Sequence, residues 1–136
     1  MHAQEIISSH PDVRGQVNDA LIRCIEECFD CAQTCMSCAD ACLGESNVME
    51  LRQCIRLNLD CADVCLATGS TGSRRTGSNE ELLRSMLETC ALACRLCADE
   101  CDKHARHHEH CRICAEACRR CEEACEGAVR TIGFGH

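Results

Sequence analysis

Apolar residues recur at steps of three and four along most of this chain of 136 residues, which is the period of an amphipathic α-helix. Val13, Val17 and Leu21 begin the pattern, and cysteines continue it. Clusters of glycine, serine and threonine interrupt it from Gly44 to Ser46 and from Thr68 to Ser78. The pattern predicts an all-α chain with helices at about residues 12–43, 48–68, 79–104 and 108–128, and a loop at 69–78.

The ends of these helices are inferred from capping and turn residues. Ser9 with Asp12 resembles a capping box, as does Ser78 with Glu81. The third and fourth helices are separated without glycine or proline, but a single helix over 79–127 would be about 70 Å long, so a turn is expected. Residues before Asp12 are expected to form either a short helical arm or a mobile segment. Short connections predict an antiparallel up-down-up-down four-helix bundle, a single domain over residues 1–136.

Cysteine takes the place of the usual core residues in this chain. It occurs 18 times, whereas there are two phenylalanines and no tryptophan or tyrosine. On the first helix, six cysteines at alternating steps of four and three lie on one stripe about 27 Å long. Asn58 takes the stripe position where the second helix would otherwise carry a cysteine. The stripes contain Cys24, Cys28, Cys31, Cys35, Cys38, Cys42, Cys54, Cys61, Cys65, Cys90, Cys94, Cys97, Cys101, Cys111, Cys114, Cys118, Cys121 and Cys125.

Other roles for these cysteines fit the pattern less well. Cysteine can act as a small apolar core residue, but all 18 fall on the predicted core stripes. Bacterial ferredoxins carry the cysteines that bind their iron–sulfur clusters on loops, with a different spacing. Five CxxC pairs arise from the helical rhythm, without the βαβ pattern of a thioredoxin-like redox motif. A structural zinc protein needs four cysteines and not eighteen, which counts against zinc. Facing helices could still supply tetrahedral sites, so zinc storage stays as an alternative.

Copper(I) fits the cysteine pattern best. Soft thiolates select Cu(I), and cysteines four apart on a helix can hold one ion between two sulfurs. Buried thiols are expected to stay protonated without metal, and each Cu(I) then displaces about one proton. If thiolates bridge neighbouring ions, the capacity is about one Cu(I) per cysteine. We therefore expect a copper storage protein without catalysis, in which Cu(I) ions bind the cysteines and Asn58 is a further candidate ligand.

Histidines gather where the third predicted helix ends and the fourth begins, and we call this end of the bundle the histidine end. His104 and His108 continue the helical stepping between Cys101 and Cys111, so they are expected to point inward. His110 ranks behind them as a ligand, and His107 is as well explained by an exposed position. Imidazole is a suitable copper ligand, so copper is expected to enter here. Met49 is expected nearby, whereas His2, His10 and His136 are expected at the surface.

The opposite end is predicted to be closed by Leu21, Ile25, Leu83, Leu87 and Val129.

Charge and terminal sequence indicate the compartment and exclude some partners. Residues Met1 to His10 show no basic stretch followed by an apolar run, so no export signal is expected. Dense cysteine in the reducing cytosol is more typical of metal binding than of disulfides. The net charge of −8 disfavours nucleic acid and anionic membranes as partners, and no apolar segment reaches about 20 residues. We expect a cytoplasmic protein.

The chain resembles the bacterial four-helix bundle copper storage proteins, in particular their cytosolic branch. The resemblance covers nearly the whole chain and is carried by three runs, CIEECFDCAQTCMSCADAC at 24–42, CIRLNLDCADVC at 54–65 and HEHCRICAEACRRCEEAC at 108–125. It implies reversible Cu(I) sequestration, a homotetramer and entry at the histidine end. Asn58 departs from relatives that carry an acidic residue there. A Cu(I) metallochaperone that serves a copper donor or acceptor protein is the alternative function.

Overall fold

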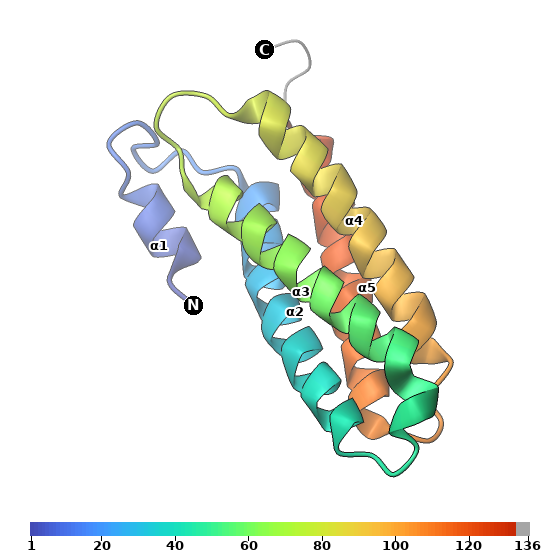
Figure 1. The fold of residues 1–136 in the computed structure, drawn as a ribbon. Coiled ribbons are helices and arrows are strands. Elements are labelled where there is room, and N and C mark those ends of the chain that lie inside the picture. The colour runs from blue at the N-terminus through green and yellow to red at the C-terminus, as the bar shows by residue number, and fades with distance from the viewer. Residues whose placement is uncertain (133–136) are drawn as a thin grey trace.

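The computed structural model describes residues 1–132, and these form an antiparallel four-helix bundle with a short helical arm (Figure 1). In the bundle α2 contacts α3 and α5, and α4 contacts the same two helices. This arrangement confirms the predicted all-α bundle. The expectation for His136 lies outside the described residues. The elements are α1 (Ala3–Ser8), α2 (Asp19–Leu43), η1 (Val48–Leu51), α3 (Arg52–Ser73), α4 (Glu80–Asp102) and α5 (Glu109–Val129).

The first bundle helix begins later than the predicted residue 12. Arg14 and Gly15 have φ angles of 51° and 81°, and this left-handed backbone cannot continue a right-handed helix. Helix α2 instead begins after Asn18, whose side-chain oxygen accepts a hydrogen bond from the Leu21 amide at 3.1 Å. The segment before it contains α1, which packs on α2 through buried Ala3 and Ile7. Of the two alternatives, the helical arm is the correct one.

The predicted loop at 69–78 is wrong in its first half, because α3 continues to Ser73. Glycine at position 69 lets α3 approach α2 closely, since a Cβ atom there would lie 3.0 Å from the ring of Phe29. The hydroxyls of Thr71 and Ser73 donate to carbonyls four residues earlier, at 2.8 and 2.7 Å. Packing against α2 thus keeps helical a segment whose composition favours a loop.

The two connections at the histidine end are short. Helix α3 is preceded by the 3₁₀ turn η1, and the chain turns between α4 and α5 over residues 103–108. His108 adopts an extended backbone, with φ −137° and ψ 112°, which ends the preceding turns before α5 starts. The expected turn is therefore present without glycine or proline. Figure 1 shows both connections at the same end of the bundle.

The opposite end of the bundle carries the apolar layer that the sequence predicted. Four apolar side chains are buried there, and Val129 packs on this layer from a half-buried position; the four are Leu21, Ile25, Leu83 and Leu87.

The arm adds a further contact at this end, where His10 Nε2 lies 3.0 Å from Thr76 Oγ1. This contact is exposed, and His10 lies half-buried at the surface. Within residues 1–132, none of the helices is long and apolar enough to cross a membrane.

Candidate metal centre

All 18 cysteines are free thiols and all lie inside the bundle. Each is at most 2% exposed. Sulfurs from facing helices are in direct contact, from 3.5 Å between Cys24 and Cys125 to 4.0 Å between Cys38 and Cys111. Two zinc–sulfur bonds placed end to end would span about 4.6 Å, so sulfurs at these separations are within reach of one bridging ion. The predicted burial of the cysteine stripes is confirmed.

The thiols form overlapping groups of four along the bundle. In each group the ligand atoms lie within 4.8 Å of one another. Cys31 contacts Cys35 on its own helix at 3.8 Å and Cys118 on α5 at 3.7 Å. Contacts between helices are therefore as short as those within a helix. Four of these groups are Cys28, Cys90, Cys121 and Cys125; Cys31, Cys65, Cys94 and Cys121; Cys31, Cys35, Cys61 and Cys118; and Cys35, Cys97, Cys114 and Cys118.

Burial raises the pKa of some of these thiols. It raises the pKa of Cys42 from 9.0 to about 11, because the thiolate would lose its hydration. Contact with Cys121, together with burial, raises the pKa of Cys94 above the ordinary range. Both thiols are therefore neutral near pH 7. A soft cation that replaces the proton leaves the interior close to electrical neutrality.

Asn58 lies among the thiols and is fully buried. Its side-chain oxygen accepts S–H hydrogen bonds from Cys97 and Cys114, each at 3.1 Å, and from Cys101 at 3.5 Å. Its amide group donates to the sulfur of Cys54 at 3.8 Å. The expected position of Asn58 on the core stripe is therefore correct, and its side-chain oxygen contacts three thiols.

At the histidine end, His110 has direct contacts with sulfur. Its Nδ1 lies 3.4 Å from the sulfur of Cys38 and 3.6 Å from that of Cys111. The ligand atoms of His110, Cys38, Cys42 and Cys111 form a group within 4.8 Å of one another. His110 Nε2 donates to Glu45 at 2.8 Å, and this bond holds the pKa of the Glu45 carboxyl below its usual value. The group combines three thiols with one imidazole.

The other histidines at this end take different positions. His108 Nδ1 lies 3.0 Å from the same oxygen of Glu45, and its ring stacks on that of His110 with centroids 5.4 Å apart. His104 Nε2 contacts Glu100 at 3.0 Å. The expected ranking is therefore reversed for His110, which ranked behind His104 and His108 but has the sulfur contacts. His107 and Met49 are exposed.

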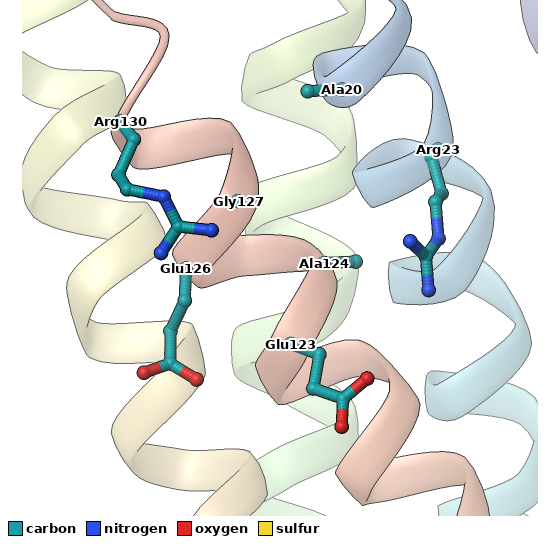
Figure 2. Close-up of a pocket in the computed structure, with 7 residues that line it drawn as sticks. All are labelled: Ala20, Arg23, Glu123, Ala124, Glu126, Gly127 and Arg130. Carbon is teal, nitrogen blue, oxygen red and sulfur yellow. The ribbon is translucent and has the colours of Figure 1, made fainter.

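Two grooves differ in their relation to the thiols. One of about 370 Å³ is lined by both Cys38 and His110, together with Ser37, Ala41 and Ile113. It gives access from solvent to the histidine end between α2 and α5. Another of about 380 Å³ lies near the other end, where Figure 2 shows its lining residues on α2 and α5. Its lining residues are Ala20, Arg23, Glu123, Ala124, Glu126, Gly127 and Arg130, so it lies outside the thiol interior.

Sequence reasoning missed Glu45 as a residue of this site. It lies in the connection after α2 and contacts two histidines that follow it by 63 and 65 residues. The cluster of histidines in the sequence predicts a carboxylate nearby, because a histidine that binds metal usually donates its other ring N–H to a carboxylate or carbonyl. The spacing of the helices does not indicate which acidic residue supplies it.

A four-helix bundle with buried thiols in continuous contact defines a class of protein that binds soft metal ions in its interior. Residues 17–130 match the family model described as copper storage protein. The chain belongs to the copper storage protein family. Among curated protein sequences, none matches the chain significantly.

Solved structures of the family are similar over most of the chain. The copper storage protein Ccsp of Streptomyces lividans, in a structure loaded with 10 copper equivalents, is 50% identical, with a TM-score of 0.90 over 94% of this chain and 98% of that one. A cytosolic copper storage protein from Streptomyces lividans, in a structure with five coppers, is 54% identical, with a TM-score of 0.83 over 85% of this chain and 96% of that one. The Cu(I)-bound copper storage protein BsCsp3 is 38% identical, with a TM-score of 0.67 over 80% and 93%.

Proposed function

We propose that the chain is a single bundle domain that stores many Cu(I) ions on the thiolates of its interior. The observation that carries this proposal is the contact of buried sulfurs from one end of the bundle to the other, from Cys24 with Cys125 to Cys38 with Cys111. Copper loading of the Streptomyces lividans relative supports the same function. All 18 cysteines and Asn58 are the proposed ligands in the interior.

The sequence hypothesis placed each ion between two cysteines four residues apart on one helix. The structure favours shared coordination by cysteines of facing helices as well. Cys65 illustrates this, because its sulfur lies 3.8 Å from Cys61 on the same helix, and 3.7 Å from both Cys90 and Cys94 on α4. One thiolate therefore has several partners with which to share an ion. Sharing raises the number of ions that a fixed number of thiolates can hold, which suits storage.

Copper entry is proposed at the histidine end. The groove lined by Cys38 and His110 leads from solvent to the first group of thiols. Imidazole nitrogen is a suitable copper ligand, whereas the opposite end is covered by Ile25, Leu83 and Leu87. His104, His108 and His110 are the proposed ligands on the entry path. Copper would then pass from His110 and Cys38 to thiols deeper in the bundle.

The proposed setting is the reducing cytosol. Free thiols favour it, and the Streptomyces lividans relative is described as cytosolic. A homotetramer is proposed from the family resemblance, and exposed Leu59, Leu66, Leu92 and Leu96 on α3 and α4 offer apolar surface for contact between copies. Light scattering of the purified protein tests this: a mass of four chains supports the tetramer, and a mass of one chain contradicts it.

A copper chaperone is the second candidate, but chaperones present a CxxC pair at the surface for exchange, and here the cysteines are buried. Competition and transfer experiments test the choice. Reduced protein loaded with Cu(I) should release it slowly to a chelator, and excess zinc should not displace it. Complete transfer of one ion within seconds would favour the chaperone. Preferential retention of zinc over Cu(I) would favour zinc storage.

A further inference from the structure

Glu45 joins two histidines through a single carboxylate oxygen. Its Oε2 lies 3.0 Å from Nδ1 of His108 and 2.8 Å from Nε2 of His110. The two rings are stacked, with an angle of 21° between their planes. Glu45 thus contacts different nitrogens of two neighbouring rings. The contact spans the bundle end, because Glu45 follows α2 whereas both histidines lie at the start of α5.

A carboxylate only accepts hydrogen bonds, so each histidine nitrogen that faces Glu45 must carry a proton. In a neutral ring the other nitrogen then carries a lone pair. For His110 this nitrogen is Nδ1, which lies 3.4 Å from the sulfur of Cys38 and 3.6 Å from that of Cys111. For His108 it is Nε2, which is buried and has no hydrogen-bond partner among the residues that the structure describes.

We propose that Glu45 is a positioning residue that holds His108 and His110 in opposite tautomers, so that His108 Nε2 and His110 Nδ1 present lone pairs to incoming Cu(I). Free rings would interconvert between the two tautomers and rotate. A bound carboxylate removes both freedoms, which makes the nitrogen ready to bind metal and raises its basicity. This inference rests on the proposed function for its copper step, but its structural step does not involve metal.

The tautomers are tested first in the metal-free, reduced protein. Long-range ¹H–¹⁵N correlation spectra of histidine-labelled protein at about pH 8.5 report which nitrogen of each ring carries the proton. The expected result is a protonated Nδ1 for His108 and a protonated Nε2 for His110. Glu45→Ala should abolish this difference. Glu50→Ala is the matched control, because Glu50 is an exposed carboxylate at the same end and should leave both rings unchanged.

Copper uptake is tested second, with a chelator that competes for Cu(I). Glu45→Ala should weaken the first Cu(I) bound at this end by about 10- to 100-fold, the usual effect of removing a group that orients a metal ligand. The total capacity should stay the same. The same tautomer in both rings of the native protein would overturn the proposal, as would unchanged tautomers in Glu45→Ala. A capacity of only a few ions in the native protein would instead contradict the proposed storage function and leave the tautomer result standing.

Discussion

The side-chain oxygen of Asn58 lies 3.1 Å from the sulfur of Cys114, in the interior of the bundle. Cys97 donates to the same oxygen at the same distance. Asn58 therefore serves as the shared acceptor for thiols from α4 and α5. A buried thiol and a buried amide each need a partner, and the contact satisfies both. The position that interrupts the cysteine stripe of α3 is thus a polar link between three helices.

Asn58→Cys should complete this stripe and raise the copper capacity by about one ion per chain, because one thiolate is added to the shared network. The metal-free protein should lose about 1 kcal/mol of unfolding free energy, since the thiols of Cys97 and Cys114 exchange a strong acceptor for a weak one. Titration with Cu(I) and chemical denaturation measure the two effects. Asn58→Ser is the control, because serine is similar in size to cysteine but provides no thiolate. Equal capacities for the cysteine and serine variants would contradict a ligand position at residue 58.

The arrangement of the interior could be predicted from the sequence because its signal is periodic. Steps of three and four place Cys24, Cys28 and Cys31 on one face of a helix, and four such faces can be buried only against one another. Asn58 was placed by the same argument. The closed end followed too, since Leu83 and Leu87 continue the cysteine stripe of α4.

The ends of the elements could not be predicted as well. The left-handed backbone at Arg14 depends on how the arm folds back on α2, for which the spacing gives no signal. The helical continuation to Ser73 depends on the close contact of Gly69 with Phe29. A residue's intrinsic preference is a weak guide where tertiary packing decides the conformation.

Gly69→Val should destabilise the bundle by about 1–3 kcal/mol, because the added methyl groups would overlap the ring of Phe29 and push α3 away from α2. Denaturation of the reduced, metal-free protein measures this. Gly127→Ala is the matched control on α5, where a Cβ atom meets only the end of Arg130 at 3.9 Å. It should stabilise the protein by about 0.5–1 kcal/mol. Equal stability of Gly69→Val and the native protein would show that α2 and α3 are not packed as described.

The metal-free protein should lose stability as the pH rises from 9 to 11. The pKa of Cys42 is raised from 9.0 to about 11, so in this range the unfolded chain releases its proton while the folded chain keeps it. The unfolded state then binds fewer protons, and the unfolding free energy falls with pH. Denaturation at pH 8, 9.5 and 11 under reducing conditions checks this. Stability that rises across this range would contradict a buried, protonated thiol at Cys42.

Replacing both His104 and His108 with alanine should slow copper uptake more than it lowers capacity. The initial rate should fall by about tenfold, which is the order of effect for groups that support metal ligation, whereas the thiols stay in place. Stopped-flow uptake of Cu(I) from a weak chelator measures the rate. His107→Ala is the control, because His107 is exposed at the same end. Native uptake kinetics in the double variant would contradict a role for His104 and His108 in copper entry.

The details of the histidine end could be predicted only in part. Sequence spacing favoured His104 and His108 over His110, because they continue the helical steps from Cys101 to Cys111. Helical stepping does not apply in the turn before α5, because the backbone of His108 is extended there. The side chain of His110 instead contacts Cys38 on α2. Contacts that depend on the path of a turn carry no periodic signal, and Glu45 was missed for the same reason.

The storage account is tested most directly by anaerobic titration of the reduced protein with Cu(I) against a competing chelator. Saturation well above four ions, approaching about one per cysteine, is the predicted result, because each thiolate can bridge neighbouring ions. Saturation at one to four ions per chain would show that the buried sulfurs do not act together as a copper store.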